Sequence, residues 1–506
     1  MLSLLNKLGI EYFRRRMERV DQYRNRPHQA QARVFEELIR QGTHTEWGRK
    51  YSYASIRHPE QYRERVPAST YEELFPYIER LLRGEQKVLW PSTIRHFSKS
   101  SGTTNDRSKY IPISEESLQK CHYDCGKDML AIYADLYPDA NVFAGKGLSV
   151  GGSLQTNPYN PKTYCGDISA LIMQNLPFWA EWLRTPSLEV ALLSDWEEKI
   201  WRMANEASRE DVRSIQGVPT WTIFLIKKVV ELKGATNILD VWPDLELFIH
   251  GAVNFDPYRK LFRELIPSPG MRYLEVYNAS EGFFGIQDQK AAGDMLLTLD
   301  NGIYYEFAPM SEWDKPFPKT LGLDAVDTHT NYALIISTNA GLWRYKIGDT
   351  VKFTSLNPFR IRITGRTKHF INAFGEEVVV ENAEAALTRA AEQTGAIVSN
   401  FTAAPVFIQA QEKGGHQWII EFEQPPNSLS RFTEALDTTL REINADYDAK
   451  RAHDIALQMP LITQVPKGTF YHWMKKRGKL GGQHKVPRLS NDRTYVEDLL
   501  RFAEGL

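Results

Sequence analysis

The chain is poor in cysteine, which limits what its cysteines can do. Only Cys121, Cys125 and Cys165 occur among its 506 residues. Three is too few for a disulfide framework, and the odd number argues against one, so we expect free thiols and a reducing, cytoplasmic location. Cys121 and Cys125 flank His122 at helical spacing, as metal ligands could. Because no second ligand pair follows at zinc-like spacing, we interpret them as free thiols on a helix.

The chain also lacks an excess of charge and a long apolar run. Its net charge is −1 and its pI is near 6.9, so no broad positive field is available for nucleic acid or an anionic membrane. Any phosphate must be met locally, by a few side chains and backbone amides. No apolar stretch approaches the ~18–20 residues that span a bilayer, and the start lacks the features of a secretion signal. Leu4, Leu5, Leu8 and Tyr12 recur at helical spacing, which predicts an amphipathic helix docked on the body; a membrane-surface helix is the alternative.

The length and texture of the chain predict two domains. A chain of 506 residues exceeds the roughly 250–300 residues at which one hydrophobic core stops growing. Residues 1–85 are expected to be mostly helical. From about residue 88, short apolar segments alternate with turns and helices, which predicts an α/β fold with several sheets. The helices are expected at Glu189–Ala207, at Phe224–Lys233 and from a start around Val380 to Glu384. We place a boundary within GRTKH, giving an N-terminal domain of residues 1–366 and a smaller α+β domain of residues 367–506.

The first polar motif is HFSKSSGTTNDRSKYIPIS, residues 96–114. A strand leads into small hydroxyl residues around a glycine, which let backbone approach a phosphate and add O–H donors. Lys109 would add a point charge. The motif is not a Walker A loop, and such runs are most often plain surface turns. The candidate phosphate contacts are Ser100, Ser101, Gly102, Thr103 and Thr104.

The second and third motifs each place a carboxylate in a turn. EVYNASEGFFGI, residues 275–286, predicts a strand that ends near Ser280 and Glu281, and one carboxylate beside aromatics suits Mg²⁺ and a flat base. LWRYKIGDTVKF, residues 342–353, predicts Asp349 at a strand end, where it could accept hydrogen bonds from two ribose hydroxyls. Taken alone, the first of these segments is better explained by a solvated glutamate in a turn before two core phenylalanines, and Gly348-Asp349 also fits a type I turn or the closing residue of a hairpin.

The three motifs in this order, followed by GRTKHFINAFGEEVVVENAE, resemble the adenylate-forming superfamily of acyl-CoA synthetases, luciferases and adenylation domains. The sequences of the three motifs, SSGTT, YNASEGFFGI and WRYKIGD, are most similar to those of the Gretchen Hagen family of acyl-acid amido synthetases, in a bacterial-type form. The resemblance runs from about Pro67 to Pro487. It implies a large, multi-sheet N-terminal adenylating domain and a mobile C-terminal lid that swivels at Thr367-Lys368.

The resemblance also implies a role for each motif. The loop that contains Ser100, Ser101, Thr103 and Thr104, called the hydroxyl loop below, would hold the phosphates of ATP. Asn278 and Ser280 would lie at the nucleotide, and Glu281 would bind Mg²⁺. Asp349 would hold the ribose, which Arg366 would also reach. Lys485, in the basic loop GQHKVPR, would meet the α-phosphate from the lid, while Lys109 would balance the charge of the departing phosphates.

The implied reaction is ATP-dependent ligation of a carboxylic acid through an acyl-adenylate. The acceptor is expected to be an amine such as an amino acid; a thiol of coenzyme A or of a carrier protein is the alternative, and a non-catalytic nucleotide-binding protein is a second one. We expect the acyl pocket between residues 150 and 260, with Trp221, Phe224 and Phe255 as candidate wall residues. Plain core packing is the competing interpretation of these aromatics.

Overall fold

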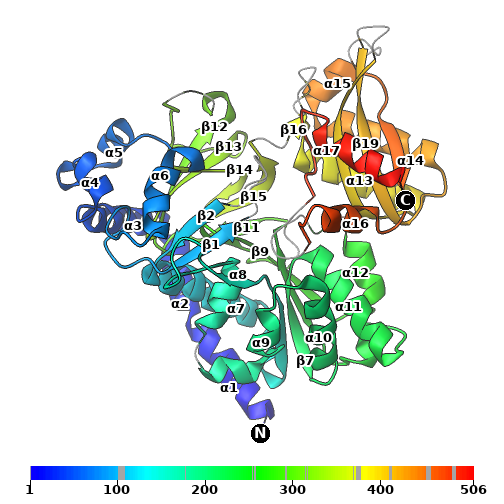
Figure 1. The fold of residues 1–506 in the computed structure, drawn as a ribbon, viewed down its shortest axis with the longest axis horizontal. Helices are drawn as coiled ribbons and strands as arrows, with labels where there is room; N and C mark the ends of the chain where they lie inside the picture. Colours follow the sequence, from blue (N-terminus) through cyan, green and yellow to red (C-terminus); the bar gives the residue numbers. More distant parts are fainter. Residues whose placement is uncertain are drawn as a thin grey trace. The chain divides into compact units, whose positions relative to one another are not determined.

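The chain forms two compact units, shown in a computed structural model (Figure 1). Unit 1 comprises Met1–Val253 and Leu265–Arg362, and unit 2 comprises Asn254–Glu264 and Ile363–Leu506. The structure describes residues 2–100, 109–176, 178–252, 255, 258–290, 293–313, 315, 317–367, 370–371, 376, 378–408, 413–451, 457–480 and 486–505.

Unit 1 begins with a series of helices before its first strand. Thr70 starts the last of them with a capping box, because its side chain accepts from the backbone N of Glu73 while the Glu73 carboxylate accepts from the backbone N of Thr70. The helices are α1 (Leu2–Arg15), α2 (Met17–Asn25), α3 (Pro27–Gly42), α4 (Glu46–Lys50), α5 (Pro59–Arg65) and α6 (Tyr71–Leu82).

Helix α1 packs through a different face from the one that the leucine spacing predicts. Leu8 and Tyr12 are 60% and 62% exposed, so the prediction that they dock the helix is wrong. The contact is made instead by Asn6, whose amide bonds to the carbonyl oxygen of Ala140 and to the backbone N of Phe143. A buried amide with both groups satisfied fixes one face of the helix more specifically than exposed leucines could.

Among the described residues, the main sheet of unit 1 has eleven strands, in the order β12-β13-β14-β15-β11-β10-β9-β8-β7-β3-β6. Strands β6, β3, β7, β8 and β9 are parallel to their neighbours in this series. The pairs β9-β10, β10-β11, β11-β15 and β13-β14 are antiparallel. The strands are β3 (Lys146–Val150), β6 (Arg184–Thr185), β7 (Val212–Gly217), β8 (Leu247–Gly251), β9 (Arg272–Ala279), β10 (Gly282–Ile286), β11 (Met295–Leu297), β12 (Ile303–Pro309), β13 (Asn331–Thr338), β14 (Tyr345–Leu356) and β15 (Phe359–Arg366).

A smaller sheet and a second set of helices complete unit 1. The sheet has the order β2-β1-β5-β4, with strands β1 (His96–Ser100), β2 (Lys109–Ile113), β4 (Leu154–Thr156) and β5 (Tyr164–Gly166). The helices are α7 (Asp124–Leu136), which continues the π-helix Ser117–Tyr123, then α8 (Ile168–Gln174), α9 (Leu188–Ala191), α10 (Trp196–Ala207) and α11 (Pro219–Lys233). In Figure 1, α10 and α11 lie beside β7.

Unit 2 is a small α+β unit with its own core. Trp418 of the central strand is fully buried among side chains from the two packed helices α13 and α14. Its sheet has the order β18-β19-β20, and a separate pair is formed by β16 and β17. The elements are α12 (Arg259–Leu265), β16 (Phe370–Ile371), β17 (Val378–Val379), α13 (Val380–Thr394), β18 (Ile397–Ile408), β19 (Lys413–Gln424), α14 (Leu429–Ile443), α15 (Ala445–Arg451), β20 (Leu461–Val465), α16 (Thr469–Lys476) and α17 (Thr494–Ala503).

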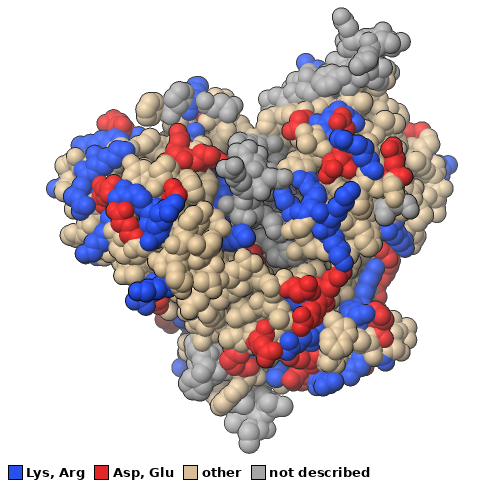
Figure 2. Space-filling view, viewed as in Figure 1, with Lys and Arg blue, Asp and Glu red and all other residues tan. Residues whose placement is uncertain are grey.

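The surface carries both signs of charge. Figure 2 shows acidic and basic side chains interspersed over the visible face, with one group of basic side chains over α16. That helix ends in Lys475 and Lys476, and Arg477 and Lys479 follow it. Within the described ranges, no helix is both long enough and apolar enough to cross a membrane.

Candidate active site

The first motif forms a hairpin in the smaller sheet. Strand β1 ends at Ser100, which lies opposite Lys109, the first residue of β2. The Nζ atom of Lys109 is 5.5 Å from the centroid of the Tyr71 ring, a cation–π distance. The Tyr71 hydroxyl in turn accepts a hydrogen bond of 2.8 Å from the backbone N of Tyr110. The candidates Ser101, Gly102, Thr103 and Thr104 lie outside the described residues.

A buried hydrogen bond joins the first motif to the second. The hydroxyl of Ser98, two residues before the end of β1, lies 2.9 Å from the hydroxyl of Ser280. Both side chains are essentially fully buried. The strand that leads into the hydroxyl loop is therefore held directly against the turn that carries Ser280 and Glu281.

A second buried hydrogen bond joins the second motif to the third. The hydroxyl of Tyr277, in β9, donates to Oδ2 of Asp349 at 2.6 Å. Asp349 is 7% exposed. The prediction that it lies at a strand end is wrong, because β14 continues through it to Leu356. The pairing with β13 shifts register here, and Gly348 has φ +90°, so a β-bulge turns the backbone within the strand.

The second motif lies at the edge where the parallel strands end. Asn278 is in the last turn-facing part of β9, half-buried and opposite Phe283 of β10, and the half-buried Glu281 follows Ser280 in the connecting turn. Strand β8 ends beside it at Gly251, where an added Cβ would lie 2.3 Å from the carbonyl oxygen of Val276. Ligands of open α/β sheets bind outside the carboxyl ends of parallel strands. The position of this turn therefore suits a bound nucleotide.

The other candidates are placed separately. Arg366 is the last residue of β15 and half-buried, and Lys485 lies outside the described residues. Trp221 is buried in α11, with its ring centroid 4.6 Å from that of Trp196, so it contributes to the packing of α10 on α11. Phe224, one helical turn later, is 42% exposed and has surface for a ligand.

Phe255 belongs to unit 2, so unit 1 does not bring it together with the aromatics of α11. Its ring contacts Phe262 at a centroid distance of 5.1 Å, and the guanidinium of Arg259 lies 5.1 Å from its centroid. The side chain is 2% exposed. These contacts favour the core-packing interpretation of Phe255 over a role in the acyl pocket.

The cysteines and His122 are buried. All three cysteines are free, and burial raises the pKa of Cys125 well above its usual range. Burial also lowers the pKa of His122 to about 4, so its ring is neutral near pH 7. Among the residues that the structure describes, no group of three or more His, Cys, Asp or Glu side chains is arranged to hold a metal.

A buried ion pair locks the start of the third motif. Arg344, just before β14, has φ +44°, which is unusual for a residue other than glycine. Its guanidinium makes two hydrogen bonds, of 2.9 and 3.0 Å, to the carboxylate of Glu306, and both side chains are at most 3% exposed. It also donates to the carbonyl oxygens of Arg63 and Val66. These contacts hold a backbone conformation that would otherwise be unfavourable.

A buried lysine holds the turn that follows β3. Nζ of Lys199, in α10, donates to the carbonyl oxygen of Gly152 at 2.7 Å. Oδ2 of Asp167 accepts from the backbone N of Ser153, and the Ser169 hydroxyl accepts from the backbone N of Gly152. Burial lowers the pKa of Lys199 to about 8, and the carboxylate of Asp167 only partly opposes this effect.

The lowered pKa predicts that Lys199 makes stability depend on pH. The pKa of lysine in an unfolded chain is about 10.4, so between pH 8 and pH 10 the unfolded chain binds more protons and the folded state gains stability as pH rises. Relative to Lys199→Met, we expect the wild type to gain about 2 kcal/mol between pH 7.5 and pH 9.5. Urea unfolding at both pH values measures this change. Lys233→Met, at the exposed end of α11, is the control, and its free energy of unfolding should differ from that of the wild type by the same amount at both pH values. If the difference between the wild type and Lys199→Met were also the same at both pH values, the prediction would be wrong.

Several of these residues were missed by the sequence analysis, although some left a signal. Ser98 and Tyr277 lie inside the first two motifs, each in a strand that leads into a candidate loop or turn. Lys199 follows Trp196 by three residues and precedes Met203 by four, so a charged residue occupies the apolar stripe of its helix. The pairing of Arg344 with Glu306 left no such signal.

Comparison with known families gives matches along most of the chain. Residues 16–271 match the GH3 family N-terminal domain, residues 296–366 the GH3 family central domain, and residues 381–494 the GH3 family C-terminal domain. An indole-3-acetic acid-amido synthetase, GH3.3 of Arabidopsis thaliana, is 22% identical and covers 90% of this chain and 88% of its own. The jasmonoyl-L-amino acid synthetase JAR6 of Nicotiana attenuata is 24% identical, with 90% of each chain covered.

Solved structures with the same fold include a GH3.15 acyl acid amido synthetase. It superposes with a TM-score of 0.76 at 16% identity, covering 94% of this chain and 93% of its own. A 2-hydroxyisobutyryl-CoA ligase superposes with a TM-score of 0.59 at 13% identity, covering 94% and 92%. Together with the elements of the two units, these matches confirm the predicted α/β fold with a large multi-sheet N-terminal part and a smaller α+β C-terminal part.

Proposed function

The chain belongs to the GH3 family, and on this premise we propose that it is an ATP-dependent ligase that converts a carboxylic acid to an acyl-adenylate, releases pyrophosphate and transfers the acyl group to an amine, specifically an amino acid. One structural observation carries the proposal. Two buried hydrogen bonds, Ser98–Ser280 and Tyr277–Asp349, draw the three polar motifs together. Segments separated by 182 and 72 residues thus converge, which supports a shared nucleotide site.

The first half-reaction sets a clear requirement for positive charge and positioning. A carboxylate must attack the α-phosphorus of ATP, so two anions meet and the transition state accumulates negative charge. Lys109 would balance the charge of the departing phosphates, and the hydroxyls and amides of the Ser100–Thr104 loop would hold their oxygens. Lys485 would meet the α-phosphate. Asp349 would accept hydrogen bonds from the ribose, which Arg366 would also reach; these roles follow from the family resemblance.

Glu281 fits a magnesium ion that arrives with ATP. Mg²⁺ in nucleotide sites takes one or two carboxylates, and its other ligands are phosphate oxygens and water. Glu281 offers one half-buried carboxylate next to Ser280, in the turn after a parallel strand. When bound, the ion would supply positive charge to the phosphate oxygens. The side chain of Ser280, fixed by Ser98, would keep the turn in place beside it.

The acid is proposed to lie against α11, with Phe224 as the exposed aromatic of that helix. Trp221 would support it from behind, since it is buried against Trp196. Exclusion of water from the site would protect the mixed anhydride from hydrolysis before the amine attacks. We place the reaction in the reducing cytoplasm, a proposal that the three free cysteines support.

Pyrophosphate exchange tests the proposal directly. We expect the wild-type protein, given Mg²⁺, ATP and a panel of carboxylic acids, to incorporate labelled pyrophosphate into ATP with at least one acid and without an acceptor. A protein that binds ATP but exchanges with no acid would instead be a non-catalytic nucleotide-binding protein. Mass spectrometry of products formed with mixed amino acids and thiols then identifies the acceptor: an amide supports the proposal, and a thioester would assign coenzyme A or a carrier-protein thiol.

A further inference from the structure

The peptide groups of Phe283, two residues after Glu281, are held by side chains. The pairing of β9 with β10 shifts register between Phe283 and Gly285, so the ladder is irregular directly after the turn. The backbone N of Phe283 donates to Sγ of Cys121 at 3.1 Å. Its carbonyl oxygen accepts from the hydroxyl of Thr298 at 2.7 Å and from the amide of Asn301 at 2.6 Å. Side chains thus satisfy groups that an irregular ladder would leave unpaired.

The side chains that hold the peptide groups of Phe283 form a clamp, with Cys121 on one side and Thr298 and Asn301 on the other. The two sides come from distant parts of unit 1. Cys121 lies in the π-helix Ser117–Tyr123, while Thr298 and Asn301 lie in the segment between β11 and β12. A π-helical turn is rare in proteins, but those that occur are often at functional sites, where the turn shifts the side chains that follow it. Here it precedes α7, which begins at Asp124 and carries Asp128 one turn later.

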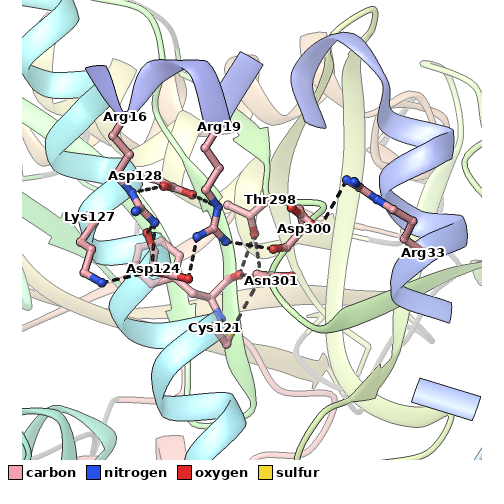
Figure 3. A network of polar contacts seen from close by, with 11 residues as sticks. Arg16, Arg19, Arg33, Cys121, Asp124, Lys127, Asp128, Thr298, Asp300 and Asn301 are labelled. Atoms are coloured by element: carbon pink, nitrogen blue, oxygen red, sulfur yellow. Dashed lines mark hydrogen bonds and ion pairs between the residues drawn. The ribbon is translucent and has the colours of Figure 1, made fainter. Parts of the chain in front are cut away.

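A network of ion pairs ties both sides of the clamp to helix α2 (Figure 3). Arg16 pairs with Asp128 at 2.6 Å, and Arg19 pairs with Asp124 at 2.6 Å, so α2 is fixed to the start of α7. Arg19 also donates to the carbonyl oxygen of Asp300 at 3.1 Å, next to Asn301. The same arginine therefore contacts the helix that follows Cys121 and the segment that carries Asn301.

We propose that Cys121 is a positioning residue for the Ser280–Glu281 turn: its sulfur, with Thr298 and Asn301 opposite, fixes the peptide groups of Phe283 and so sets where the Glu281 carboxylate points. This inference rests on the proposed function, in which Glu281 serves the magnesium of bound ATP. Because the turn is only two residues long, a shift of the Phe283 peptide moves Glu281 with it. Small displacements of charge-bearing groups reduce nucleotidyl-transfer rates strongly.

Position 121 accepts only a small side chain that carries a hydrogen-bond acceptor. A Cβ added at Gly282 would lie 3.4 Å from Sγ of Cys121 and 2.3 Å from Cδ1 of Ile303, so the turn already packs closely on the thiol. Alanine at position 121 would leave the buried N–H of Phe283 without its acceptor. Serine would keep an acceptor at nearly the same place, although on a shorter bond.

Cys125 offers a matched control. It is as buried as Cys121, at 1% exposure, and lies one turn further along the same helical segment. Cys125→Ala removes the same volume from the same region and leaves the acceptor of the Phe283 N–H in place. Any effect shared by Cys121→Ala and Cys125→Ala is therefore one of packing and not of positioning.

Two measurements test the inference. We expect hydrogen exchange of the Phe283 amide to accelerate about tenfold or more in Cys121→Ala and less than twofold in Cys125→Ala, with Cys121→Ser close to the wild type. In pyrophosphate exchange, we expect Cys121→Ala to raise the Mg²⁺ concentration for half-maximal rate about fivefold or more. Cys121→Ser should restore most of that loss, and Cys125→Ala should keep the wild-type value.

The outcomes separate this inference from the proposed function. Equal amide exchange in the two alanine variants, or equal Mg²⁺ requirements, would overturn the role of Cys121 while the ligase activity of the wild type still stands. A wild-type protein without pyrophosphate exchange would overturn the proposed function, and the link to magnesium with it. Even then, the amide exchange of Phe283 would decide whether the sulfur holds this turn.

Discussion

Replacement of Glu306 by leucine is expected to lower the free energy of unfolding of unit 1 by about 3–5 kcal/mol, the usual cost of removing one member of a buried ion pair. The carboxylate is the partner of the Arg344 guanidinium and also accepts from the hydroxyl of Thr320 at 2.6 Å. Without it, the Arg344 charge stays buried with only neutral partners. Because stabilities of folded proteins are themselves only 5–15 kcal/mol, the effect should be conspicuous.

The loss should extend to the third motif because Arg344 holds a left-handed backbone conformation at its start. Two backbone hydrogen bonds join this part of the chain to Ser69. The backbone N of Ser69 donates to the carbonyl oxygen of Arg344, and the backbone N of Lys346 donates to the carbonyl oxygen of Ser69. If the guanidinium loses its anchor, the strain at Arg344 can relax by moving the chain that leads to Asp349. We therefore expect weaker ATP binding in addition to lower stability.

Urea unfolding followed by tryptophan fluorescence measures the stability change, and two variants control it. Glu37→Gln removes the partner of Arg40 in an exposed pair on α3 and should cost less than about 1 kcal/mol. The double variant Glu306→Leu with Arg344→Met removes both buried charges and should recover part of the loss. Recovery should be incomplete, because the carbonyl oxygens of Arg63 and Val66 also lose their donor. A cost for Glu306→Leu no larger than that for Glu37→Gln would refute the argument.

Local signals predicted the elements of this fold better than their ends. The stretch around Phe224–Lys233 was expected to be helical, and its helix begins at Pro219, which is favoured at a first helical position. The expected helix from Glu189 to Ala207 is instead two helices, because Asp195 caps a new one by accepting from the backbone N of Glu198. In unit 2, the helix expected after Val380 begins at that residue.

The candidate site was predictable only in part, and the reason is physical. Each motif could be recognised by its small hydroxyl residues, its carboxylate or its glycine. The bonds that bring motifs together could not, since Ser98 and Ser280 are 182 residues apart and their pairing depends on the whole sheet order. Asp349 shows the same limit on a smaller scale. A glycine before an aspartate fits both a turn and a bulge, and only the pairing with β13 decides between them.

The largest effect on nucleotide binding is expected from Asp349→Ala, which should raise the dissociation constant of ATP at least about 100-fold. Hydrogen bonds to a charged group each contribute about 1.5–3 kcal/mol, and a carboxylate that accepts from two ribose hydroxyls would make two of them. The carboxylate is already oriented, since the Tyr277 hydroxyl donates to its Oδ2. Titration of the variant with ATP and with 2′,3′-dideoxy-ATP measures the effect. We expect the wild type to discriminate strongly between the two nucleotides and Asp349→Ala to bind both equally weakly.

Tyr277→Phe separates the orientation of the carboxylate from the carboxylate itself. This variant keeps the acid and nearly all of the ring, whose centroid lies 4.8 Å from that of Phe284, but it removes the hydroxyl that holds Asp349. We expect ATP binding to weaken about tenfold, less than in Asp349→Ala, with the preference for the ribose hydroxyls retained. In the double variant the two effects should not add, because the hydroxyl acts only through the carboxylate. Additive losses, or an Asp349→Ala variant that still distinguishes ATP from its dideoxy form, would mean that the ribose is held elsewhere.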